Sequence, residues 1–300
     1  MSWAGQAGVQ RAPNTERLSH MRNSTRFVIA GLAGVVLLAA TGCDKLRARD
    51  HLNQGVLAYK SAKYSDAAEH FKAAIALDPT YNSARLYLAT AYMVQWIPGA
   101  ESPENLEFAR KAHEEFMKVL EQDANDKNAM ASLAFLSYNQ AQSLPADQKA
   151  AKYDEASEWY HKLIAIDPTN KEAFYTLGVI AYAKWYPALM LARANLRMKP
   201  EDPGPLKDKK VKDELKSKYS SIVEEGIGNL QKAIDIDKEY DDAMAYMNLL
   251  VRERADLLDS NGDYKQQIEV ADNWLQKALD TKKIKASRTA PTGGIVNDSK

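Results

Sequence analysis

The sequence has only one cysteine, Cys43, among its 300 residues. An intrachain disulfide is therefore excluded, and the fold must be held by the packing of apolar side chains. Its five histidines show no spacing typical of metal ligands. The stretch from His113 to Met117 lacks the second histidine of the zinc-protease motif, and no glycine-rich loop that could cradle a phosphate occurs. The sequence thus gives no sign of a catalytic site, a metal site or a cofactor, and we expect the protein not to be an enzyme.

An excess of charge of one sign is also missing, because 40 Lys and Arg balance 40 Asp and Glu. Residues 44–300 alone carry 36 basic and 39 acidic side chains. No stripe of Lys and Arg with interleaved aromatic residues occurs, so nucleic-acid binding is disfavoured. The composition, 45% hydrophobic and 27% charged, is that of a globular chain.

The sequence has one long apolar run, residues 27–40, and it is 14 residues long. A helix that spans a bilayer needs about 20 such residues. Arg22 and Arg26 stand directly before the run. A short apolar run after basic residues is typical of a secretory signal peptide.

The lone cysteine follows this run in the sequence Ala40-Thr41-Gly42-Cys43. The stretch resembles the bacterial lipobox, although Ala40 stands where leucine is more common. The resemblance implies a signal peptide over residues 1–43, with Met21 as an alternative start. It also implies that Cys43 carries palmitate-type acyl chains, which would anchor the body in the periplasm to the inner or outer membrane. The alternatives are an uncleaved anchor helix, or a signal without lipid in which Cys43 is incidental.

Three stretches of the remaining chain repeat each other. Ala73–Thr80 and Lys162–Thr169 share a run of apolar residues followed by Asp-Pro-Thr, and Lys232–Lys238 lacks only the proline. Each stretch ends one amphipathic segment and leads into the next. Self-similarity of this kind indicates a repeat array.

Residues 48–81 resemble the tetratricopeptide repeat, a pair of antiparallel helices. The matching positions are Ala48, Gly55, Tyr64, Ala67, Phe71, Ala74 and Pro79. Small residues at three of these positions let the two helices approach closely. The two aromatic residues fill the space between hairpins, and the proline ends a helix.

The resemblance implies an all-α helical solenoid of about five helix-turn-helix units over residues 44–283. The expected units are 48–81, 82–126, 127–170, 171–240 and 241–282. Units two to five are longer than the first, and each insertion falls between the two helices of its hairpin. The insertions should therefore share one edge of the solenoid, where they either mark a binding side or are tolerated surface length.

Three stretches carry expectations of their own. Pro187–Arg197 should be a short extra helix with proline in its first turn, and Pro200–Lys210 a mobile loop. Residues 284–300 lack an apolar period and should be a disordered tail. Asp259–Asp263 is similar to the opening of a calcium loop, but the glycine and glutamate that the loop needs are missing. We therefore expect a turn between helices.

On a tetratricopeptide array, certain first-helix positions face a concave groove. The partner groove is expected to include Tyr59, Lys60, Met93, Phe135, Tyr138, Asn139, Tyr175 and Tyr182. Such an apolar, tyrosine-rich groove would suit an extended peptide or an amphipathic helix, although these residues could also simply pack. Leu52 and Val56 replace the Lys and Asn with which the family clamps a peptide carboxylate, so recognition of a free C-terminus is disfavoured.

Units two and four share an aromatic stretch at the expected end of the first helix, Trp96-Ile97-Pro98 and Trp185-Tyr186-Pro187. These aromatic residues either cover the end of a hairpin or form a partner-facing edge made of Trp96, Trp185 and Tyr186.

The sequence therefore predicts a membrane-anchored envelope lipoprotein that acts as a scaffold or adaptor for protein or peptide partners. One alternative is a component of outer-membrane protein assembly or pilus biogenesis. The alternative from another class is a calcium- or sugar-binding envelope protein.

Overall fold

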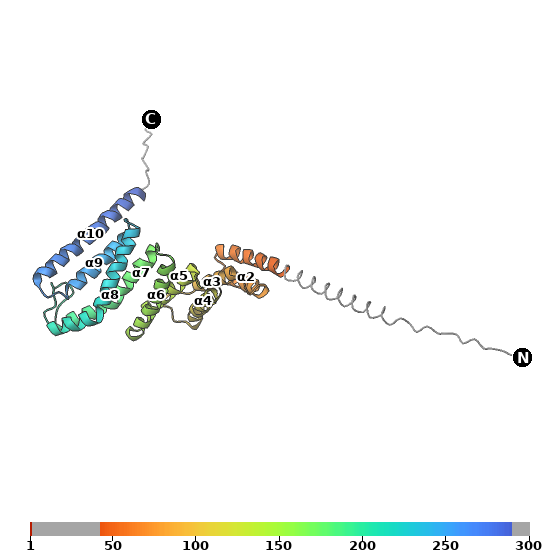
Figure 1. Cartoon of the computed structure of the whole chain (residues 1–300), viewed down its shortest axis with the longest axis horizontal. Helices are drawn as coiled ribbons and strands as arrows, with labels where there is room; N and C mark the ends of the chain where they lie inside the picture. Colours follow the sequence, from red (N-terminus) through yellow and green to blue (C-terminus); the bar gives the residue numbers. More distant parts are fainter. Residues whose placement is uncertain (2–42, 290–300) are drawn as a thin grey trace, which may run out of the picture. The chain divides into compact units, whose positions relative to one another are not determined.

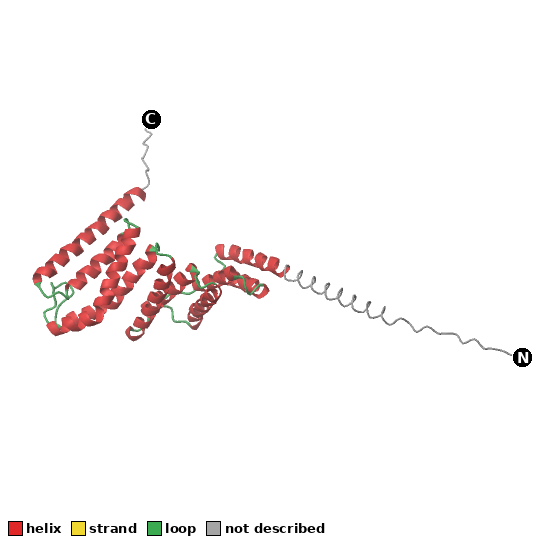
Figure 2. Ribbon diagram, in the orientation of Figure 1, coloured by secondary structure: helices red, strands yellow, loops and turns green. Residues whose placement is uncertain are grey.

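The computed structural model describes residue 1 and residues 43–289. These residues form helices joined by loops and contain no strand (Figures 1 and 2). Residues 43–60 form the first helix. The others are α2 (Tyr64–Leu77), α3 (Asn82–Met93), α4 (Pro103–Gln122), α5 (Lys127–Ser143), α6 (Ala146–Ile166), α7 (Lys171–Asn195), α8 (Lys209–Ile236), α9 (Asp241–Ala255) and α10 (Asn261–Thr289). In chain order they make five pairs. No helix among residues 43–289 is both long and apolar enough to cross a membrane.

The chain divides into two compact units, one ending at Leu88 and the other beginning at Ala89. In the first unit, the ring of Phe71 packs directly on Gly55, where an added Cβ would lie 2.5 Å from its Cε1 atom. Ala67 and Ala74 on α2 are fully buried. Small side chains therefore let residues 43–60 and α2 approach closely.

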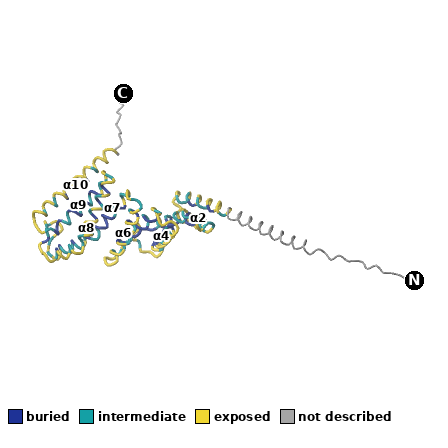
Figure 3. The backbone as a smooth tube through the Cα atoms, in the orientation of Figure 1, coloured by how far each residue is buried: buried dark blue, intermediate teal, exposed yellow. Residues whose placement is uncertain are grey.

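The second unit repeats this arrangement between α7 and α8. A Cβ added at Gly178 would lie 2.4 Å from Cγ of Leu230, and one added at Gly226 would lie 2.4 Å from Cβ of Ala181. Leu230 is fully buried. Buried positions follow α7, α8 and α9 through this unit (Figure 3). Close packing of two helices on glycine thus holds the fourth hairpin together.

The repeated aspartate shapes the turn after three of the second helices. The Asp78 carboxylate accepts the Thr80 N–H at 3.1 Å, and the Asp167 carboxylate accepts the Thr169 hydroxyl at 3.0 Å. Asp237 accepts the N–H two residues further on at 2.9 Å. These local hydrogen bonds, between residues two apart in the sequence, replace the hydrogen bonds of a further helical turn. They therefore end the helix at the aspartate.

The structure corrects the extra helix expected at Pro187–Arg197, because α7 runs unbroken through Pro187 to Asn195. Trp185, Leu189 and Arg193, four residues apart, all lie on the buried face of α7. A proline inside a helix costs about 3 kcal/mol. Burial of two large apolar side chains on either side of it is of similar size, which explains why the helix continues.

The loop expected to be mobile is tied to the core. The Leu206 side chain in residues 196–208 is 1% exposed, and its N–H donates to the Asp256 carbonyl at 2.9 Å. Arg193 donates to the Lys199 carbonyl at 2.8 Å and forms a buried ion pair with Asp256. The insertion between α7 and α8 is therefore packed into the compact unit that begins at Ala89. Helix α8 begins after it, at Lys209.

The last helix is longer than expected, since α10 reaches Thr289 whereas the tail was expected to begin at residue 284. Lys285 pairs with Asp241, and Arg288 pairs with Glu239 at 2.7 Å. Charged side chains hold this end, so an apolar period could not reveal it. Residues 2–42, which hold most of the signal peptide expected over 1–43, and residues 290–300 of the expected tail lie outside the described residues.

Residues 256–260 form the turn between α9 and α10. The Asp259 carboxylate pairs with the ammonium groups of Lys212 at 3.2 Å and Lys216 at 3.0 Å. Two cations beside this carboxylate disfavour a calcium ion at the same place. The stretch around Asp259 is thus a turn that binds α8.

Candidate interaction surface

The residues expected in the groove lie on the first helices of their pairs. Phe135 on α5 is 47% exposed, whereas Met93, Tyr138, Asn139, Tyr175 and Tyr182 are partly buried. Tyr59 and Lys60 lie at the end of the first helix, in the first unit. The second unit holds the other six.

Five tyrosines of the second unit form a continuous row of rings, which we name the tyrosine ladder. Its members in spatial order are Tyr240, Tyr175, Tyr246, Tyr182 and Tyr186. Successive ring centroids are 5.0, 5.7, 5.8 and 5.0 Å apart. The two contacts of Tyr246 are edge-to-face, and Tyr182 stacks on Tyr186. All five are half-buried, so each ring packs on one side and leaves part of its surface open.

Helix periodicity places the ladder on two neighbouring first helices. Tyr175, Val179, Tyr182 and Tyr186 are three or four residues apart and share one face of α7. Tyr246 lies on α9, which contacts α7 directly. The ladder therefore joins the first helices of the fourth and fifth pairs.

Two of the expected groove tyrosines also contact the second helix of their own hairpin. The Tyr138 ring lies 6.0 Å from that of Tyr153 on α6, and the Tyr59 ring lies 5.2 Å from that of Tyr64 on α2. Both pack at least in part within their own hairpin. Tyr182, at the same repeat position, instead contacts Tyr246 of the next pair.

Two other expected groove residues are polar. The Asn139 amide donates to the Phe135 carbonyl on its own helix at 2.8 Å. Lys60 is exposed in the first unit.

Both tryptophans are buried, which favours the packing alternative over a partner-facing aromatic edge. Trp185 is 0% exposed, with its ring 5.5 Å from that of Tyr219 on α8, and Trp96 is 6% exposed. Next to Trp96, Asn105 accepts the Ile97 N–H at 2.7 Å and fixes the loop. Burial of these large indoles outweighs any role at the surface. Tyr186 belongs to the ladder instead.

Burial and nearby carboxylates raise the pKa of three ladder phenols, those of Tyr240, Tyr175 and Tyr182. Burial raises the pKa of Tyr240 to about 12, with Glu172 and Asp242 adding to the shift. The pKa of Tyr175 is raised by burial and by Asp242, and that of Tyr182 by burial and by Glu253. The ladder thus offers neutral hydroxyls beside negative charge.

Glu253 on α9 is a half-buried carboxyl whose pKa is strongly raised. Burial raises its pKa to about 7, and the neighbouring Asp256 adds to the shift. Arg193 and Arg252 act in the opposite direction. Glu253 is therefore partly protonated at neutral pH, at the end of the ladder near Tyr182.

The sequence analysis missed Tyr240, Tyr246, Asp242 and Glu253. Matches to the repeat in the fifth unit were confined to its second helix, so no groove positions were assigned on α9. Tyr246 also lies one residue beyond the position that holds Tyr175 in its unit. A search for aromatic residues on either side of each assigned position would have found it.

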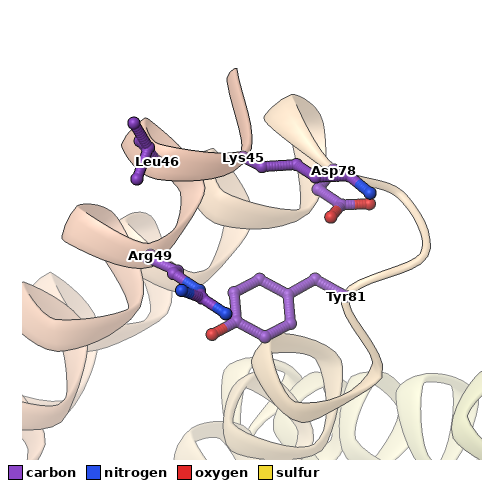
Figure 4. Close-up of a pocket in the computed structure, with 5 residues that line it drawn as sticks. All are labelled: Lys45, Leu46, Arg49, Asp78 and Tyr81. Carbon is purple, nitrogen blue, oxygen red and sulfur yellow. The ribbon is translucent and has the colours of Figure 1, made fainter. Parts of the chain in front are cut away.

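A separate hollow of about 400 Å³ lies in the first unit, two residues after Cys43 (Figure 4). It is lined by Lys45, Leu46, Arg49, Asp78 and Tyr81. The Arg49 side chain extends toward the ring of Tyr81 (Figure 4). The Cys43 thiol itself is free and exposed. The helix that begins at the expected lipid site therefore carries basic side chains in its first turns.

Comparison with known proteins supports the repeat directly. Residues 48–81 match the family described as Tetratricopeptide repeat. A MamA RS-1 ArsTM double mutant superposes with a TM-score of 0.50 at 16% identity, covering 80% of this chain and 97% of that chain. With the five helix pairs, this confirms the fold class, a tetratricopeptide-type helical solenoid.

Two further solved structures are similar at lower scores. A thermophilic TPR protein of Thermus thermophilus, TTC0263, has a TM-score of 0.41 at 13% identity, covering 80% of this chain and 97% of that one. YrrB, described as a TPR protein with an unusual peptide-binding site, has a TM-score of 0.42 at 14% identity, covering 78% and 90%. No curated protein sequence matches the chain.

Proposed function

We propose that this protein is a lipid-anchored scaffold of the bacterial cell envelope that binds a partner protein on its tyrosine ladder. The observation that carries the proposal is the continuous row of five half-buried tyrosine rings on α7 and α9. Tetratricopeptide repeats present their first helices to partners, and the ladder lies on two of them.

The chemistry of the ladder suits protein binding. A tyrosine ring offers a large apolar surface and a hydroxyl, and it has little side-chain entropy to lose. Contacts between neighbouring rings hold each ring in place before a partner arrives, which lowers the entropic cost of association. A row of such rings fits an extended segment or one face of a helix.

The anchor would be at Cys43. Its exposed thiol stands at the start of the first helix, and Lys45 and Arg49 follow on that helix. Two or more acyl chains give stable attachment to a membrane, and basic side chains next to them suit anionic lipid headgroups. The repeats would then face the periplasm.

Partner recovery from cells tests the proposal. The full chain would be crosslinked, purified in detergent and compared with the double variant Tyr182→Ala and Tyr246→Ala. We expect the variant to lose the specific partner while its melting temperature stays within a few degrees. The control is Tyr219→Ala, which removes a half-buried ring on α8 that packs on Trp185. Recovery that is unchanged in the double variant, or lost equally in the control, would overturn the proposal.

A further inference from the structure

Three carboxylates accompany the ladder. On α9, Asp242 lies one turn before Tyr246, and Glu253 lies two turns after it, on the same stripe of the helix. On α7, Glu172 lies one turn before Tyr175. Each acts electrostatically on a ladder ring: Asp242 on Tyr175, Glu253 on Tyr182 and Glu172 on Tyr240. Negative charge is therefore spread along the whole row.

The cations near this face already have other partners. Lys171 pairs with Asp237 at 2.7 Å, and Arg193 pairs with Asp256 inside the core. Two more cations are paired between α9 and α10, Arg252 with Asp272 and Lys285 with Asp241. Glu172 lies 3.8 Å from Lys171, beyond the shorter pair with Asp237. Each of these four cations is paired with an aspartate other than Asp242. The carboxylates of Glu172, Asp242 and Glu253 therefore remain as additional acidic groups, and the ladder face is locally acidic.

One end of the ladder already holds a cation in the way that a partner could. The Lys171 ammonium lies 5.2 Å from the centre of the Tyr240 ring while it pairs with Asp237. An ammonium or guanidinium held between a tyrosine ring and a carboxylate gains from both the ring's negative face and the ion pair. Further along the row a carboxylate also acts on a ladder ring at two places, Glu253 on Tyr182 and Asp242 on Tyr175.

We propose that the tyrosine ladder binds a cationic partner segment, in which Lys or Arg side chains alternate with apolar ones. This inference rests on the proposed function and gives it a partner chemistry. The apolar side chains would pack on the open parts of the rings. One cation would lie between Glu253 and Tyr182, and another between Asp242 and Tyr175. An acidic segment or a free peptide carboxylate would meet repulsion along the whole face.

Selection of random peptides displayed on phage against the full chain in detergent tests this inference. The expected result is enrichment of peptides rich in Lys or Arg and apolar residues, whose binding is lost in the double variant Tyr182→Ala and Tyr246→Ala. Enriched acidic or uncharged peptides that need the same two tyrosines would overturn the cationic partner and leave the proposed function standing. A selection that yields no peptide dependent on these tyrosines would overturn both.

Titration with one enriched peptide and its Lys/Arg→Gln counterpart then locates the charge. We expect Glu253→Gln and Asp242→Asn each to lower the affinity for the cationic peptide about fivefold. The affinity for the Gln counterpart should not change. Glu269→Gln on α10 removes an exposed charge from another helix and is the control. Equal effects of Glu253→Gln and Glu269→Gln would contradict the assignment.

The pH dependence of that affinity gives an independent readout. The groups facing Glu253 are Asp256 and Arg252 on or beside α9, and Arg193 and Tyr182 on α7. A bound cation favours ionised Glu253, so affinity should rise between about pH 6 and pH 8. Glu253→Gln should flatten this rise. A rise in affinity that persists in the variant would show that another group titrates. It would overturn the placement of a partner cation at Glu253.

Discussion

Arg193 and Asp256 form an ion pair in which both side chains are only 5% exposed. The pair joins the extension of α7 to the residue that follows α9. The same arginine donates to the carbonyls of Lys199 and Asp202, and the Asp256 carbonyl accepts the Leu206 N–H. One buried ion pair therefore holds the insertion between α7 and α8 against the end of α9.

Removal of Arg193 should unfold the second unit more easily. Arg193→Met leaves the Asp256 carboxylate buried without its partner, and we expect a loss of about 3–5 kcal/mol in the free energy of unfolding. Arg252→Met breaks the exposed pair with Asp272 and should cost no more than about 1 kcal/mol. Urea denaturation followed by circular dichroism measures both. Equal small losses would show that the pair is not structural.

Gly178 and Gly228 offer a matched pair of glycine-to-alanine substitutions. A methyl group at Gly178 would meet Cγ of Leu230, which cannot swing aside, so Gly178→Ala should cost about 1–3 kcal/mol. Nothing lies within 4 Å of a Cβ added at Gly228 on α8. Gly228→Ala should therefore stabilise the helix, by up to about 1 kcal/mol. If both variants shift the melting temperature in the same direction, the close α7–α8 contact is wrong.

Stability should depend on pH through Glu253. Its pKa is about 7 in the folded state and near 4.5 when unfolded, so the folded state binds the proton more tightly. Protonated Glu253 therefore contributes to the free energy of unfolding. This stabilisation is fully present below about pH 4.5 and is lost as the pH rises through about 7. Glu253→Gln stays neutral and should be more stable than the natural chain at about pH 8, by on the order of 1 kcal/mol. The difference should vanish near pH 4.5, and Glu269→Gln controls for the lost charge. Urea denaturation at both pH values decides, and a difference that does not change with pH would refute the shift.

The helix pairs could be predicted from the sequence because the signals for them are local. Asp-Pro-Thr turns and the small residues at Gly55 and Gly178 recur at fixed places. The errors arose where tertiary burial or charge prevailed over a local signal. Pro187 indicated a helix end, but burial of Trp185 and Leu189 carries α7 through it. The last turns of α10 are held by ion pairs, which leave no apolar period. Tyr246 joins the ladder from a unit whose first helix had no recognised match.

The membrane anchor is tested by Cys43→Ser. We expect this variant to lose labelling by a radioactive or clickable palmitate analogue, and either to leave the membrane fraction or to accumulate as an uncut precursor. The reason is that a hydroxyl is a poor replacement for the thiolate that accepts the lipid. Labelling at the natural level in Cys43→Ser would rule out this residue as the anchor.

Photo-crosslinking from the ladder in living cells tests the central claim most directly. A photoreactive phenylalanine analogue would replace Tyr182 or Tyr246 and, as controls, the exposed Leu191 on α7 or Leu279 on α10. The account predicts one discrete crosslinked protein from both ladder positions and none of that size from the controls. Crosslinks from Leu191 and Leu279 with none from Tyr182 and Tyr246 would contradict it and place the partner on another face.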